Sequence, residues 1–146
     1  MARETTSPEE TAAAGAELAA ALRPGDVVLV SGDLGAGKTV FVRGACRALG
    51  VTEPVTSPTF TIGQVYGGRV EVAHLDLYRL DGLGGEDPAL LEDYLTAWRI
   101  GFVEWPAVGA GRIGGVAARV TLEHAGDDRR RIAVERVGAG AGDAAP

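Results

Sequence analysis

The residues with the clearest chemical pattern lie in one glycine-rich string, Gly32-Asp33-Leu34-Gly35-Ala36-Gly37-Lys38-Thr39. Its spacing fits G-x-x-x-x-G-K-[S/T], a loop whose backbone N–H groups surround a polyphosphate. Lys38 is the only lysine of the chain, and every other basic residue is an arginine. The chain therefore has a compact, flexible ammonium only at the position where a phosphate-binding loop requires one. The string predicts a phosphate-binding P-loop, with Lys38 on the β- and γ-phosphates and the Thr39 hydroxyl on Mg²⁺.

Two acidic residues are candidates for the metal side of this site. Asp76 and Glu104 each follow an apolar run that is typical of a strand. In open α/β sheets ligands bind beyond the carboxyl ends of the strands, where both carboxylates would lie. We therefore interpret Lys38, Asp76 and Glu104 as catalytic and Thr39, Asp76 and Glu104 as metal-binding. The alternative for either carboxylate is an ordinary turn residue.

Two neighbours of these carboxylates have more than one interpretation. Trp105 follows Glu104, and it either stacks on a nucleotide base or packs under the loop. His74 stands two residues before Asp76, so both side chains share a face of a strand. We interpret His74 as a core or supporting histidine rather than a catalytic base. A guanine-reading Asn-Lys-x-Asp motif is impossible with Lys38 as the sole lysine, which favours ATP over GTP.

The elements around the glycine string have the order that a P-loop requires. Ser7 as N-cap and Glu10 in a capping box predict a helix over residues 7–22. An apolar run predicts a buried strand at residues 26–31, and a helix is expected at residues 39–49. Strand, glycine loop and helix in this order favour a P-loop over a turn that only joins two elements.

The rest of the chain predicts further strands of one sheet. The expected elements are two hairpins (59–66 with 69–75, and 116–123 with 130–137), a short helix at 89–98 and a strand at 99–105. Residues 138–146 are almost all Gly and Ala and are expected to be disordered. The predicted fold class is α/β. We expect a small P-loop NTPase-like domain of three layers, with a mixed central sheet and β-hairpins, over residues 1–137.

Composition narrows the classes of function. A chain of 146 residues is expected to form one domain. Its net charge of −6 makes it a poor candidate for extensive direct binding to nucleic acid. One cysteine, Cys46, excludes an intrachain disulfide and a cysteine-rich metal site. No apolar run approaches the ~20 residues that span a bilayer, so we expect no membrane association and a cytoplasmic location.

Four strings in a fixed order carry a resemblance to a known family. They are the glycine string, Ser57-Pro58-Thr59-Phe60, His74-Leu75-Asp76-Leu77-Tyr78-Arg79-Leu80 and Glu104-Trp105-Pro106. Together they resemble the TsaE (YjeE) family, the ATPase component of bacterial tRNA threonylcarbamoyladenosine (t6A) biosynthesis. The second string matches a switch-like element near the γ-phosphate. The resemblance covers about residues 7–137, and four ordered strings are more specific than a P-loop alone.

The resemblance implies that ATP and Mg²⁺ bind at the glycine string. Thr39 and Glu104 match the metal side, and Asp76 matches a Walker-B-like aspartate needed for hydrolysis. Arg130 falls where the family has a C-terminal arginine on the nucleotide side. Because Arg129 and Arg131 stand next to it, the sequence leaves open which of the three occupies that position. The positions expected to contact the nucleotide are Thr11, Asp33, Leu34, Gly35, Ala36, Gly37, Lys38, Thr39, Trp105 and Arg130.

The resemblance also implies a weak ATPase that works with a TsaD–TsaB pair and reaches tRNA only through these partners. Two other functions stay open. A small-molecule P-loop kinase would need an acceptor pocket and usually an arginine-rich lid, and residues 81–88 contain no arginine. A nucleotide-binding scaffold would keep its function after Asp76→Ala, whereas an ATPase would lose it.

Overall fold

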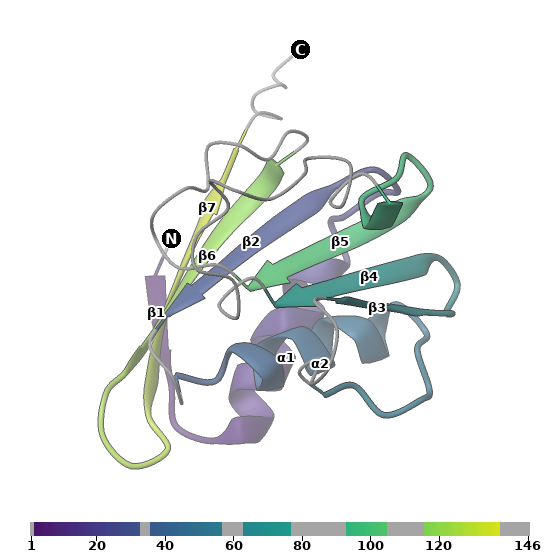
Figure 1. The fold of residues 1–146 in the computed structure, drawn as a ribbon. Coiled ribbons are helices and arrows are strands. Elements are labelled where there is room, and N and C mark those ends of the chain that lie inside the picture. The colour runs from purple at the N-terminus through teal and green to yellow at the C-terminus, as the bar shows by residue number, and fades with distance from the viewer. Residues whose placement is uncertain (1, 33–35, 57–62, 77–92, 105–115, 138–146) are drawn as a thin grey trace.

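The computed structural model describes residues 2–32, 36–56, 63–76, 93–104 and 116–137 (Figure 1). Seven strands form one sheet: β1 (Ala2–Thr5), β2 (Val27–Gly32), β3 (Gly63–Tyr66), β4 (Glu71–Asp76), β5 (Arg99–Glu104), β6 (Val116–His124) and β7 (Arg130–Arg136). Their order across the sheet is β1-β7-β6-β2-β5-β4-β3. The inner strands β6, β2, β5 and β4 are parallel, and the outer pairs are antiparallel. This mixed sheet, with the hairpins β3–β4 and β6–β7, confirms the predicted fold class.

The central strand β2 is buried on both faces. Val28 and Val30 face one hydrophobic cluster of the core, and Val27 and Leu29 face the other. A continuous apolar run, rather than an alternating one, is typical of a parallel strand covered on both sides. Because β2 pairs in parallel with both β5 and β6, its carboxyl end opens at the same edge of the sheet as theirs.

Two helices, α1 (Pro8–Ala19) and α2 (Lys38–Ala48), lie together on one face of the sheet (Figure 1). They approach unusually closely, because a glycine stands at each side of their contact. A Cβ atom on Gly44 would lie 1.9 Å from the Ala12 carbonyl oxygen, and one on Gly15 would lie 2.0 Å from the Phe41 oxygen. The contact fixes α2, and with it the end of the glycine string, against α1.

The start of α1 agrees with its predicted caps. The Ser7 hydroxyl accepts a hydrogen bond from the Glu10 N–H at 3.1 Å, so Ser7 is the N-cap. The Glu10 carboxylate accepts from the Thr6 N–H at 2.7 Å, one residue before the position of an ordinary capping box. The helix ends at Ala19 rather than Leu22, because the last turn tightens into i→i+3 hydrogen bonds.

Two further elements differ from the prediction. Strand β1 was not predicted, since Ala-Arg-Glu-Thr is short and shows no apolar alternation; it pairs with β7 at the edge of the sheet. The helix expected at residues 89–98 includes helical residues only at 93–94 in the described part, followed by a bend and a turn. Tyr94 and Leu95 pack on the face of the sheet opposite α1 and α2. The predicted disordered tail lies outside the described residues.

Candidate functional site

Helix α2 begins at the last residues of the glycine string. Gly37 is its N-cap with a left-handed φ of +96°, a conformation that favours glycine. Lys38 is buried, and its ammonium Nζ donates a hydrogen bond to the Gly32 carbonyl at 2.9 Å. A Cβ atom on Gly32 would lie 2.4 Å from the Leu122 carbonyl oxygen, so this glycine allows close passage beside β6. A side chain at either position would thus be unfavourable, at Gly37 because of its φ and at Gly32 because of the neighbouring strand.

The Glu104 carboxylate lies against the start of α2. It is 3% exposed at the carboxyl end of β5, and its Oε2 accepts from the Thr39 hydroxyl at 3.4 Å. This O···O distance is well beyond the usual 2.7–2.8 Å of a hydroxyl hydrogen bond. The structure therefore brings together two oxygen groups, 65 residues apart in the chain, that are loosely joined to one another.

Asp76 lies beside Glu104 in the sheet. The two are register partners at the carboxyl ends of the parallel strands β4 and β5, and Asp76 is 9% exposed. Two neighbouring carboxylates with little access to water repel each other when both are ionised, so a nearby cation stabilises the arrangement. The predicted trio Thr39, Asp76 and Glu104 thus meets at one edge of the sheet.

His74 is fully buried in β4, as the sequence favoured. Its Nε2 lies 2.6 Å from Oε2 of Glu104, the same oxygen that faces Thr39. Residue 74 pairs in register with Phe102, so the contact with Glu104 is a diagonal one, two residues along β5. The sequence placed His74 on the face of Asp76, but the contact with Glu104 depends on the pairing of β4 with β5.

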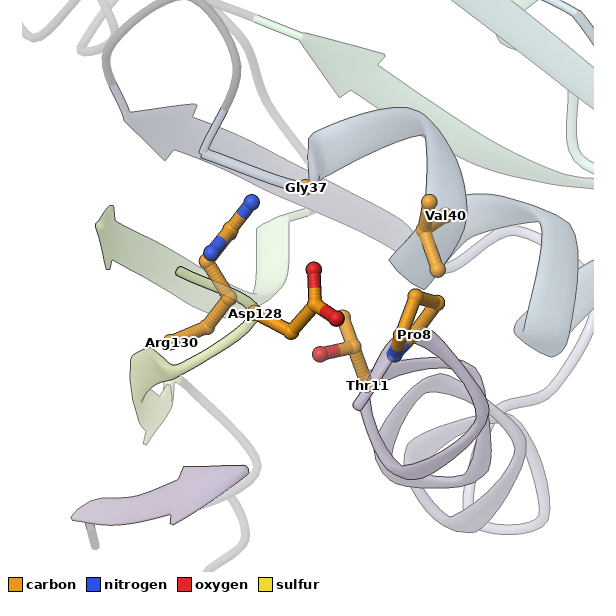
Figure 2. Close-up of a pocket in the computed structure, with 6 residues that line it drawn as sticks. All are labelled: Pro8, Thr11, Gly37, Val40, Asp128 and Arg130. Atoms are coloured by element: carbon orange, nitrogen blue, oxygen red, sulfur yellow. The ribbon is translucent and has the colours of Figure 1, made fainter. Parts of the chain in front are cut away.

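A second group of residues surrounds the N-terminal turn of α2. Thr11 is buried on α1, and its hydroxyl lies 2.7 Å from the hydroxyl of Thr5 on β1. A small cavity of about 40 Å³ opens beside it, lined by Pro8, Thr11, Gly37, Val40, Asp128 and Arg130 (Figure 2). Three distant parts of the chain, α1, α2 and the β6–β7 hairpin, thus enclose one place next to the glycine string.

The hairpin decides which of three consecutive arginines faces this cavity. A Cβ atom on Gly37 would lie 3.6 Å from Nε of Arg130, which also donates through Nη1 to the carbonyls of Asp127 and Arg129. Arg131 instead forms an exposed ion pair with Glu123 at 3.2 Å. Among these arginines, Arg130 is therefore the one that lines the cavity beside Gly37.

Sequence reasoning missed Asp128. Figure 2 shows its carboxylate between Arg130 and Thr11, in the turn that connects β6 and β7. Its sequence position gave no clear signal, because it lies in the turn before β7 and strand alternation does not apply there. The motif Gly126-Asp127-Asp128 is more typical of a simple turn, and the structure does have that turn there, with Asp127 at φ +45°.

The sole cysteine takes no part in this site. Cys46 is fully buried in α2, and burial raises the pKa of its thiol to about 12. It therefore stays a neutral thiol at ordinary pH and packs as a small apolar side chain.

The donor set at the sheet edge suits a hard cation. Among the described residues, no three His, Cys, Asp or Glu side chains meet as ligands of one ion. Mg²⁺ commonly needs only one or two protein carboxylates, and phosphate oxygens and waters complete its shell. The hydroxyl of Thr39 and the carboxylates of Asp76 and Glu104 fit that pattern. Asp33, Leu34, Gly35, Trp105 and the string 57–60 lie outside the described residues.

The mixed sheet and the glycine string between β2 and α2 define a domain of the P-loop NTPase-like class. Neither described helix is long and apolar enough to cross a membrane. A family model described as "Threonylcarbamoyl adenosine biosynthesis protein TsaE" matches residues 5–132. The chain therefore belongs to the TsaE family.

Individual relatives agree with this assignment. A Bacillus subtilis (strain 168) protein named "tRNA threonylcarbamoyladenosine biosynthesis protein TsaE" is 39% identical over 135 residues, 92% of this chain and 84% of the relative. A protein of the same name from Treponema pallidum (strain Nichols) is 34% identical over 128 residues, 88% of this chain and 95% of the relative. The crystal structure of Bacillus subtilis YdiB superposes with a TM-score of 0.75 at 35% identity, covering 96% of this chain and 87% of that one.

Proposed function

We propose that this protein binds ATP and Mg²⁺ at the glycine string and hydrolyses ATP slowly, as a component of the t6A modification machinery. The observation that carries the proposal is the meeting of Thr39 with Glu104 beside Asp76, at the carboxyl edge of the sheet and next to Lys38. The membership in the TsaE family supplies the pathway.

Each residue of the site has a separate task in this proposal. Lys38 lies at the N-terminus of α2, where the helix dipole and an ammonium both attract phosphate oxygens. Thr39 and Glu104 would hold Mg²⁺, and Asp76 would complete its shell or orient water beside it. When bound, the cation neutralises charge that develops on the phosphate oxygens during transfer.

We assign the nucleoside side of the site to the region of the cavity beside Thr11 and Arg130. It lies against Gly37 and Val40, at the N-terminal turn of α2 and next to the predicted phosphate position. At about 40 Å³ the cavity holds only a few waters, so a nucleotide at the glycine string would touch its rim rather than fill it. That rim carries the guanidinium of Arg130, the carboxylate of Asp128 and the apolar edges of Pro8 and Val40. This supports a complete nucleotide as ligand rather than inorganic phosphate.

We infer that tRNA is reached through a TsaD–TsaB-like pair rather than by this chain. The net charge of −6 opposes extensive contact with a phosphate backbone. Two arginines of the β6–β7 hairpin, Arg119 and Arg131, are already paired with Glu135 and Glu123. A partner interface requires no basic surface, so it agrees with this charge.

The test compares ATP and GTP binding and measures ATP turnover with and without the partner pair. Lys38→Ala is expected to lower nucleotide affinity or turnover about 10- to 100-fold, the effect of losing charge-assisted hydrogen bonds. Arg136→Ala is the matched control, since it removes an exposed cation away from the site. Wild-type affinity and partner-stimulated turnover in Lys38→Ala would refute the site. Transfer of label to a small acceptor would instead indicate a kinase.

A further inference from the structure

We propose that His74 is a positioning residue, which acts by holding the Glu104 carboxylate in place for the divalent cation. The inference rests on the proposed function, because it assigns a task to one residue in the same site. It concerns a side chain that would not itself touch nucleotide or metal.

The contact between the two residues is short and shielded from water. Nε2 of His74 lies 2.6 Å from Oε2 of Glu104, with the two side chains 0% and 4% exposed. A carboxylate accepts hydrogen bonds, so Nε2 of His74 is assigned as the donor in this contact. A short hydrogen bond to a charged acceptor in such a dry place is among the stronger ones in proteins.

Within the described part of the chain, the His74 ring makes its side-chain hydrogen bond with Glu104. Its other nitrogen, Nδ1, is buried and has no hydrogen-bond partner within the described part of the chain. Burying a polar ring in this way is unfavourable unless one strong contact compensates for it. The contact that does so is the one with Glu104, which points to a role for the histidine beyond filling the core.

The geometry also explains how His74 could affect a cation. Both described contacts of the carboxylate, from His74 and from Thr39, involve Oε2, and Oε1 takes part in neither. A glutamate has three side-chain torsions, so without a fixed partner it would sample several orientations. Anchoring one oxygen fixes the direction of the other. Groups that orient a metal-binding side chain in this manner typically change metal affinity 10- to 100-fold when removed.

The experiment replaces His74 by Gln, Asn and Ala in the full chain. The amide nitrogen of Gln can stand near the position of Nε2, whereas that of Asn stands nearer Nδ1. Val72→Ala is the matched control, since Val72 is fully buried on the same face of β4, away from Glu104. Three quantities are measured: Mn²⁺ affinity of the ATP-loaded protein by electron paramagnetic resonance, ATP affinity in EDTA, and melting temperature.

We expect His74→Asn and His74→Ala to weaken Mn²⁺ binding about 10- to 100-fold, with little change in ATP affinity in EDTA. His74→Gln is expected to restore most of the Mn²⁺ affinity. Val72→Ala should lower the melting temperature without a selective loss of Mn²⁺. If His74→Ala does not fold, the Gln and Asn pair gives the same comparison. In the Glu104→Gln background, changing His74 should have little further effect on Mn²⁺, because both act through one carboxylate.

The failures of the two proposals are distinguishable. If the wild-type protein binds no ATP, or if Mn²⁺ does not change its ATP affinity, the proposed function is wrong. The proposed role of His74 is then wrong as well. If the wild type binds both and His74→Asn keeps wild-type Mn²⁺ affinity, only the inference about His74 is wrong. A loss of ATP affinity in EDTA equal to the loss of Mn²⁺ affinity would also overturn it, since that indicates general distortion of the site.

Discussion

The glycine contact between α1 and α2 allows a stability prediction worked from distances. In Gly44→Ala the new Cβ would lie 1.9 Å from the Ala12 carbonyl oxygen and 2.5 and 2.6 Å from its carbonyl carbon and Cα. Real Cβ contacts below 3.0 Å essentially never occur, so the helices must separate locally by at least 1.1 Å, the difference between 3.0 and 1.9 Å. The opposing atoms are backbone and cannot rotate away.

Two effects of opposite sign decide the outcome. Alanine is favoured over glycine inside a helix by about 0.8–1.0 kcal/mol. Overpacking a core costs about 1–3 kcal/mol and sometimes more, and a gap of ~1 Å removes up to about half of each dispersion contact across the interface. The overpacking cost is expected near or above the top of its range, because Ala12 contributes main-chain atoms. The predicted net loss is about 2 kcal/mol.

The assay is thermal and urea denaturation of Gly44→Ala beside the wild type. A loss of about 2 kcal/mol corresponds to a melting temperature about 4–8 °C lower for a chain of this length. Gly67→Ala is the control, because a Cβ there meets nothing within 4 Å and the backbone has no positive φ. An unchanged or higher melting temperature for Gly44→Ala would refute the close-contact reasoning. Turnover should also fall, up to about 100-fold, since a 1 Å displacement of α2 moves Thr39 from Glu104.

Three further predictions follow from other contacts. Glu104→Gln should lower Mg²⁺-dependent turnover by about 10- to 100-fold; an unchanged rate over a Mg²⁺ titration would remove Glu104 from the metal side. Thr5→Val should cost about 1–3 kcal/mol in urea denaturation, because it leaves the buried Thr11 hydroxyl without its described partner. Adding Thr11→Val should recover part of this loss, and no recovery would contradict the hydroxyl pair. Burial raises the pKa of Cys46 from 9.0 to about 12, so its stability contribution is complete below pH 9 and is lost as the pH rises toward 12. The stability difference between wild type and Cys46→Ala should therefore shrink over that window, by at most about 1.4 kcal/mol per pH unit, and a constant difference would exclude the raised pKa.

Much of the fold could be predicted because its signals are local. The run of Val27 to Val30, the glycine string after it and the cap at Ser7 each depend on a few consecutive residues, and each element lies within a few residues of its predicted position. Strand β1 could not be predicted in this way. Its four residues carry no apolar pattern, and they form a strand only because the edge of β7 offers backbone hydrogen bonds.

Some residues of the candidate site also have local signals in the sequence, and others do not. Residue types and spacing were sufficient to select Lys38, Thr39, Asp76 and Glu104, because each stands in a motif or at the end of an apolar run. They could not select Asp128. Its neighbours indicate only a turn, and its place beside Arg130 and Thr11 depends on how the hairpin folds over α1.

By itself, the sequence determined the order of strand, glycine string and helix that a P-loop requires, and that two carboxylates end strands of the same sheet. These properties follow from backbone preferences and hydrophobic periodicity over short stretches of chain. Only the tertiary structure decided that Glu104 is held by His74 and faces Thr39, and that Arg130 rather than Arg131 turns toward Gly37. Those choices depend on strand register, where a shift of one residue turns each side chain to the opposite face of the sheet.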